Sequence, residues 1–144
     1  MFERIVVALS EEPQSRRALL SGIRLAAAMK SHLTVLSVVT SPPAYTAFAV
    51  VVDPTAPADI TDDERYVHQT LHNEARALAT EHGIEAASYI VAGREVISIV
   101  EFLREHHADL LILGLHSHTS HVSRLWNSIF SLAQDAPCSI LGVH

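Results

Sequence analysis

Short apolar runs alternate with amphipathic stretches along the chain, and this alternation predicts an α/β fold. The apolar runs are rich in β-branched residues and are bounded by polar or proline-containing segments, which favours strands. Five strands are expected, at 4–9, 32–39, 86–92, 110–113 and 139–143. Between them, apolar residues recur every three or four positions, and helices are predicted at 13–30, 61–82, 96–106 and 128–135.

The predicted strands show little polar alternation, and the run 110–113 shows none. Continuous apolar strands indicate a parallel sheet that is covered on both faces. Strands that alternate with helices and connect by right-handed crossovers form a doubly wound sheet. Ligands of such sheets bind beyond the carboxyl ends of the strands, where the winding reverses. The loops after the first and fourth strands are therefore the places to look for a site.

The connection from Thr40 to Ile60 is long for a compact domain. It contains four prolines and the apolar stretch AFAVVV at 47–52. Loops of this length without secondary structure are uncommon, and exposed apolar patches mark interaction surfaces. We expect this connection to pack as a lid or an interface.

The size of the chain indicates one domain, 1–144, around one core. The composition is 49% hydrophobic and 18% charged, which suits a sheet with both faces covered. The start of the chain lacks the features of a signal peptide, and no apolar run approaches the roughly 18 residues of a membrane span. Cys138 is the only cysteine, so an internal disulfide is excluded. We expect a cytoplasmic protein that binds no membrane.

The net charge of the chain limits the classes of partner that it is expected to bind. A net charge of −6 without a cluster of Lys and Arg argues against nucleic acid as a partner. The ten histidines are unusual, because protonating all of them would change the formal charge from −6 to +4. We therefore expect solubility to depend on pH in the mildly acidic range.

The stretch ADLLILGLHSHTSHVSRLWNSIFSLAQDAPCSILGV, at 108–143, contains a specific order of motifs. It resembles the end of the universal stress protein (UspA-like) family, where an acidic-apolar strand is followed by a loop of Gly, two residues, Gly, nine residues, Gly and Ser or Thr. The matching residues are Ala108, Asp109, Gly114, His116, Arg124, Leu125, Ser128, Ala136, Pro137 and Cys138. The start, RIVVALSEEPQSRRAL, and Gly93 before the third helix also fit, so the similarity spans the chain.

Three positions of the family's nucleotide site differ here. The second and third loop glycines are replaced by Ser117 and Asn127, and the aspartate that usually ends the first strand is Ser10. Ser117 restricts a backbone that glycine would leave free, and Asn127 is a favoured N-cap whose side chain would occupy helix amides. The Ser10 hydroxyl keeps a hydrogen-bonding group but loses the charge.

The resemblance implies a Rossmann-like, adenine nucleotide alpha hydrolase-like sheet of strand order 3-2-1-4-5. It also implies a ligand site in which backbone amides and a helix end meet phosphate groups. Carried onto this sequence, the candidate binding residues are Ala8, Leu9, Ser10, Val39, Gly114, His116, Ser117, His118, Asn127 and Ser128. ATP or AMP is the implied ligand, and no cofactor is assigned outright.

Our primary hypothesis is a non-enzymatic regulator with a degenerate nucleotide site. The alternative is a genuine ATP or AMP binder, and slow hydrolysis stays open. The sequence contains no GxSxG, HExxH or P-loop motif, so no catalytic residues are assigned. The last strand, Ser139 to Val143, would be an apolar sheet edge, and edge pairing together with the resemblance predicts a homodimer.

Histidines offer a further alternative, a pH or metal sensor. His116, His118 and His121 lie in one loop, and three imidazoles would suit zinc or copper. An alternative interpretation is that they are solvent-exposed loop residues. Glu64, His68 and His72 share one helix face at i, i+4 and i+8. We expect that face to be solvated, and we assign no metal site.

Overall fold

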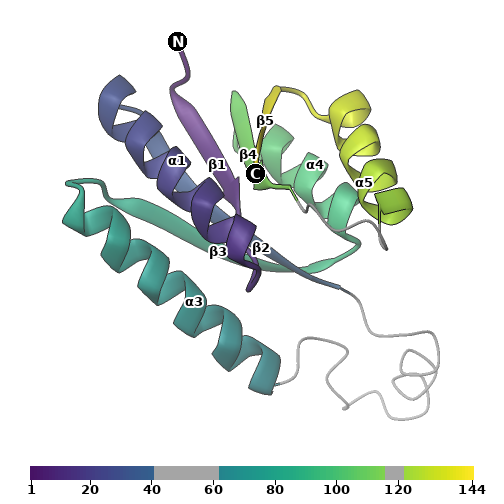
Figure 1. Cartoon of the computed structure of the whole chain (residues 1–144), viewed down its shortest axis with the longest axis horizontal. Helices are drawn as coiled ribbons and strands as arrows, with labels where there is room; N and C mark the ends of the chain where they lie inside the picture. Colours follow the sequence, from purple (N-terminus) through teal and green to yellow (C-terminus); the bar gives the residue numbers. More distant parts are fainter. Residues whose placement is uncertain (41–61, 116–121) are drawn as a thin grey trace.

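The computed structural model describes residues 1–40, 62–115 and 122–144, which form a parallel sheet with helices on both faces (Figure 1). The strands are β1 (Arg4–Ala8), β2 (His32–Thr40), β3 (Ala86–Gly93), β4 (Leu110–Gly114) and β5 (Ser139–Val143). They lie in the order β3-β2-β1-β4-β5, and every pair is parallel. This arrangement confirms the predicted fold class and strand order.

The helices are α1 (Pro13–Met29), α3 (Asp62–Glu81), α4 (Glu95–Glu105) and α5 (Val122–Asp135). Proline at the first position of α1 is preorganised for a helix start, because its fixed φ is helical and its missing N–H would have no partner there. The helix ends at Met29, and the capping residue Lys30 takes the left-handed conformation. Among the described residues, no helix is long and apolar enough to cross a membrane.

Each face of the sheet has its own apolar layer. Helices α1 and α3 cover one face, where Ile23 of α1 and Ala79 of α3 are fully buried against β1 and β2. Helices α4 and α5 cover the other face, where Leu103 and Leu132 pack near Leu111 of β4. Figure 1 shows the two helix pairs on opposite sides of the sheet. Continuous burial of β1 and β4 is the reason that their sequences lack polar alternation.

The starts of β1 and β4 are joined by Asp109. Its carboxylate accepts hydrogen bonds from the backbone N–H groups of Glu3 and Arg4, at 2.7 and 3.0 Å. The Asp109 N–H in turn donates to the Arg4 carbonyl at 3.0 Å. The acidic residue of the ADLLILG motif therefore fixes the register of two central strands.

The start of α5 differs from the prediction. The helix was expected at 128–135, but it begins at Val122, so Asn127 lies within the helix. The proposed N-cap role of Asn127 is therefore wrong, because an N-cap residue stands before the first helical turn. The apolar stretch at 47–52 and the loop histidines His116, His118 and His121 lie outside the described residues.

Candidate functional site

A cavity of about 150 Å³ lies at the carboxyl ends of β1 and β4. This is the point where the chain leaves β1 toward one face and β4 toward the other, as the doubly wound pattern predicts. Four of the candidate residues line the cavity together: Ala8, Leu9, Ser10 and Gly114. The structure therefore brings the ends of the first and fourth strands into one site.

The turn after β1 is held by hydrogen bonds from two sides. From β2, the Leu36 carbonyl accepts the Leu9 N–H at 2.8 Å, and the Ser37 hydroxyl donates to the Leu9 carbonyl at 2.7 Å. From α1, the Ser15 hydroxyl oxygen accepts the Ser10 N–H at 2.7 Å. Both polar groups of the Leu9 backbone are thus satisfied beyond the end of β1, and the cavity wall is fixed.

The side chain of Ser10 replaces the acid that the family pattern has at this position. The Ser10 hydroxyl oxygen faces the N–H of Glu12 at 3.4 Å, a long contact. A serine hydroxyl has one donor and two acceptor sites, so Ser10 can still exchange a hydrogen bond with a ligand. Such a neutral bond is about half as strong as one to a carboxylate.

Most of the remaining lining comes from the α4 and α5 side. These residues are Leu36, Val38, Ile99, Leu113, Ile129 and Leu132, with Ser15 at the start of α1. None of these residues was predicted from the sequence as part of the site. In β2 the predicted residue, Val39, is buried, whereas the neighbouring Val38 lines the cavity. Alternation along β2 places adjacent side chains on opposite faces, and this period would have distinguished the two valines.

Two carboxylates complete the lining, Glu12 beside α1 and Glu95 at the start of α4. Both side chains are exposed. Carboxylates near the opening disfavour highly charged anions, because like charges at short range repel. The described walls are therefore apolar inside and acidic at the rim.

Five candidate residues remain, at 116–118 and 127–128. His116, Ser117 and His118 are outside the described residues. Asn127 and Ser128 belong to the backbone of α5. Their proposed contacts with a nucleotide stay predictions.

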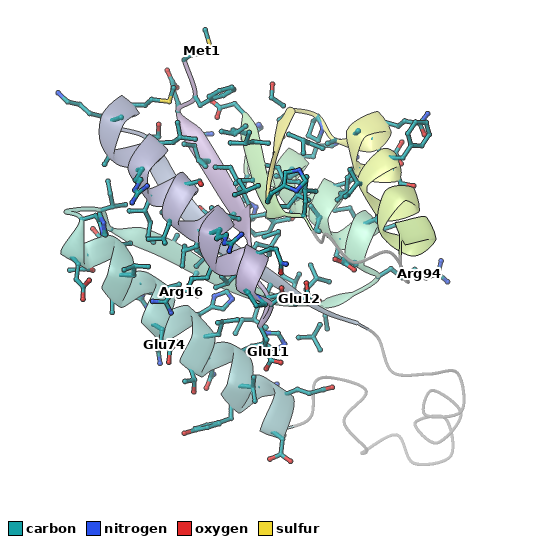
Figure 2. All side chains as sticks on the ribbon, viewed as in Figure 1. Met1, Glu11, Glu12, Arg16, Glu74 and Arg94 are labelled. Carbon is teal, nitrogen blue, oxygen red and sulfur yellow. The ribbon has the colours of Figure 1, made fainter. Side chains whose placement is uncertain are left out.

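A second hollow, of about 580 Å³, lies between α1 and α3. Leu19, Leu71 and Leu78 are among its apolar residues. The labelled side chains Glu11, Glu12, Arg16 and Glu74 come from the start of α1 and from α3, where these helices approach one another (Figure 2). Leu9 and Ser10 line this hollow as well as the cavity, so the turn after β1 separates the two.

The expectation of a solvated face on α3 is wrong at His72, whose side chain is only 2% exposed. Its Nε2 lies 2.6 Å from the Ser37 hydroxyl oxygen, and its Nδ1 lies 2.5 Å from that of Ser88. Burial, assisted by the nearby His68, lowers the pKa of His72 from 6.5 to about 4. His72 is therefore a neutral, hydrogen-bonded residue of the interior.

The described residues contain no group of His, Cys, Asp and Glu that could hold a metal ion. Cys138 is half-buried, and burial together with the Asp109 carboxylate raises the pKa of its thiol. A raised pKa lowers the fraction of reactive thiolate.

Comparisons with known proteins agree with this geometry. The sequence profile of the universal stress protein family matches residues 1–144. Universal stress protein C of Salmonella typhimurium is 27% identical over 138 residues, which are 92% of this chain and 91% of that protein.

Three solved structures share the fold. Universal stress protein UspA from Lactobacillus plantarum superposes with a TM-score of 0.79 at 17% identity, over 99% of this chain and 98% of that one. A universal stress protein in complex with cAMP has a TM-score of 0.77 at 24% identity, over 99% and 97%. The universal stress protein from Archaeoglobus fulgidus in complex with dAMP has a TM-score of 0.74 at 14% identity, over 99% and 98%.

Proposed function

Because the chain belongs to the universal stress protein family, we propose that it is a cytoplasmic, non-enzymatic regulatory protein that responds to an adenine nucleotide. The observation that carries this proposal is the cavity at the carboxyl ends of β1 and β4, lined by Ala8, Leu9, Ser10 and Gly114. Two proteins of the same fold were solved in complex with cAMP and with dAMP. A regulator of this kind changes its affinity for a partner when the ligand is bound.

The cavity favours the nucleoside part of the ligand over a polyphosphate. Its volume of about 150 Å³ is below the roughly 300 to 1,000 Å³ typical of complete ligand pockets. The apolar side chains of Leu36, Val38 and Ile99 suit a base or sugar, whereas the exposed Glu95 carboxylate at the rim adds negative charge that disfavours a polyphosphate. We therefore propose a degenerate site that prefers AMP or a cyclic nucleotide to ATP.

The first experiment is a thermal melt of the wild-type protein with and without AMP, ATP and Mg²⁺. A ligand at a hundred times its dissociation constant stabilises the folded state by about 2.7 kcal/mol, which is a clear shift in melting temperature. We expect AMP to raise the melting temperature more than ATP at equal concentration. Release of inorganic phosphate from ATP is measured in parallel, and turnover would contradict the non-enzymatic role.

A matched pair of variants on α4 locates the site. Ile99 lines the cavity and is 3% exposed, whereas Ile97 on the same helix is 51% exposed. Ile99→Trp should fill the cavity and abolish the AMP response, and Ile97→Trp should leave it unchanged. Circular dichroism checks that both variants fold. An AMP response that survives in Ile99→Trp would place the ligand elsewhere and overturn the proposal.

The loop substitutions are tested by restoring glycine. The double variant Ser117→Gly with Asn127→Gly has the glycines of the family pattern at both positions. If those two residues weaken phosphate binding, the double variant should respond to ATP more strongly than the wild type. Equal ATP responses would show that the substitutions do not make the site degenerate.

We further propose that the protein is a homodimer through β5. This strand forms one edge of the sheet, and its Leu141 is 38% exposed. An apolar edge strand is a template for pairing, and a two-fold axis closes such a pair. Sedimentation velocity should give a dimer for the wild type and a monomer for Leu141→Lys. Ile97→Lys, on exposed α4 surface, is the control and should sediment like the wild type.

A further inference from the structure

His72 belongs to a continuous line of buried hydrogen bonds that ends at the cavity wall. Ser88 of β3 contacts His72 of α3, His72 contacts Ser37 of β2, and Ser37 donates to the Leu9 carbonyl after β1. Ser37 is 1% exposed and His72 is 2% exposed. Three strands and one helix are therefore linked through polar side chains inside an otherwise apolar layer.

The direction of each hydrogen bond follows from counting donors. The Leu9 carbonyl only accepts, so the single hydroxyl proton of Ser37 is used there. The Ser37 oxygen must then accept from His72, which places the imidazole proton on Nε2. In a neutral imidazole Nδ1 is then an acceptor, and the Ser88 hydroxyl donates to it. The line thus runs from Ser88 through His72 and Ser37 to Leu9.

The groups around His72 favour this neutral form. Strands β2 and β3 contribute the hydroxyls of Ser37 and Ser88 to the two ring nitrogens, and the turn after β1 is reached through Ser37. On α3, coulombic repulsion from His68, one turn earlier, also opposes protonation of His72. A protonated ring would therefore be a buried charge whose two nitrogens face neutral hydroxyl groups.

Packing alone does not explain a histidine at this position. The neighbouring buried residues of α3 on the same side are Ala75 and Ala79, and a small apolar residue would continue that stripe. A buried imidazole is costly unless both nitrogens are satisfied. Here the satisfied ring holds the Ser37 hydroxyl in one orientation, toward Leu9.

We propose that His72 is a positioning residue for the ligand cavity, acting through Ser37 on the backbone of Leu9. His72 does not line the cavity, whereas Leu9 and Ser10 do. Without the imidazole the Ser37 hydroxyl is free to rotate away, and the Leu9 carbonyl loses its partner at the cavity wall. The effect on ligand affinity rests on the proposed function, but the effect on the Leu9–Ser10 turn does not.

Three variants separate positioning from simple packing. His72→Leu removes both hydrogen bonds and keeps an apolar side chain, and Ser37→Ala removes the link to Leu9. His72→Gln keeps a donor and an acceptor, so it should restore what His72→Leu loses. His82→Leu, at an exposed position just beyond α3, is the matched control.

The first measurement uses the protein without ligand. The amide ¹H–¹⁵N chemical shifts of Leu9, Ser10 and Glu12 are compared among the variants. We expect them to move in His72→Leu and Ser37→Ala, and to stay near the wild-type values in His72→Gln and His82→Leu. Unmoved Leu9 and Ser10 amides in His72→Leu would overturn the proposal.

The second measurement is the AMP dissociation constant by calorimetry. His72→Leu and Ser37→Ala should each weaken AMP binding about fivefold, the effect of one lost hydrogen bond, and their combination should be no weaker than either alone. Unchanged affinity in both variants would refute the positioning role. If the wild type binds no AMP, the proposed function fails, and the ligand-free amide shifts still decide whether His72 positions the turn.

Discussion

Gly114 at the end of β4 lies so close to Gln14 of α1 that a Cβ atom at position 114 would stand 2.6 Å from the Gln14 carbonyl carbon. The same Cβ atom would be 2.8 Å from the Ser15 nitrogen. Contacts this short do not occur, so only glycine allows β4 and the start of α1 to approach in this way. The family resemblance implies a glycine for phosphate approach at this loop, and the structure adds a packing reason.

The first prediction concerns this contact. Gly114→Ala should lower the free energy of unfolding by about 1–3 kcal/mol, the usual cost of overpacking, because the atoms in the way are backbone. The control is Gly142→Ala in β5, where the nearest atom is the end of the flexible Leu115 side chain. Urea denaturation of both variants measures the difference, and equal losses would contradict the explanation.

The second prediction concerns pH. The pKa of His72 is about 4 in the folded chain and 6.5 in its ordinary environment. The unfolded chain therefore binds a proton more readily between these values, so the stability contribution of His72 is complete above pH 6.5 and falls as the pH decreases. At pH 5, about 1.5 units below the ordinary value, the loss is on the order of 2 kcal/mol.

Urea denaturation from pH 7.5 to 5 tests this second prediction. The stability of the wild type should fall relative to that of His72→Gln, whose amide does not titrate. His82→Gln, at an exposed position, should follow the wild-type profile. Parallel profiles for the wild type and His72→Gln would show that His72 is not responsible.

The sequence predicted the strands well because their signal is local. Runs such as 110–113 are apolar throughout, and the strand order followed from the doubly wound pattern and the family resemblance. The contact of Gly114 with Gln14 could not be predicted in this way, because it joins residues far apart in the chain. Ala8 to Ser10 and Gly114 were found because strand ends meet at one edge of a parallel sheet.

The two wrong predictions, the start of α5 and the solvated position of His72, have separate physical causes. The start of α5 was placed at 128 because the loop motif was followed to its end, although Val122, Leu125, Ile129 and Leu132 already have helical spacing. His72 was expected on a solvated face because histidine is a polar residue that often lies at the protein surface. Its partners Ser37 and Ser88 sit on two different strands, and no periodicity in the sequence pairs them with a helix residue.

The third prediction concerns Asp109. Its carboxylate accepts two backbone hydrogen bonds that hold the start of β1. Asp109→Ala should lower the free energy of unfolding by about 1–3 kcal/mol, since hydrogen bonds to charged groups exceed neutral ones. Glu105→Ala, an exposed change at the end of α4, is the control and should change the unfolding midpoint little. If Asp109→Ala left the free energy of unfolding unchanged, the strand register would be fixed without this side chain.

The fourth prediction concerns the Cys138 thiol. Burial raises its pKa, and the Asp109 carboxylate raises it further. The rate of alkylation by iodoacetamide should therefore rise only at higher pH in the folded protein than in urea. In Asp109→Asn the pH profile should move to lower pH, because the nearby negative charge is gone. An unchanged profile in this variant would assign the whole effect to burial.

The cavity receives side chains from both helical layers, Ser15 from α1 and Ile99, Ile129 and Leu132 from α4 and α5. Elsewhere these layers form separate apolar clusters on opposite faces of the sheet. A molecule bound there would contact both helical layers at the carboxyl edge of the sheet and link them. Its binding would slow amide hydrogen exchange in α1 and in α4 together, so that the two halves would open as one unit.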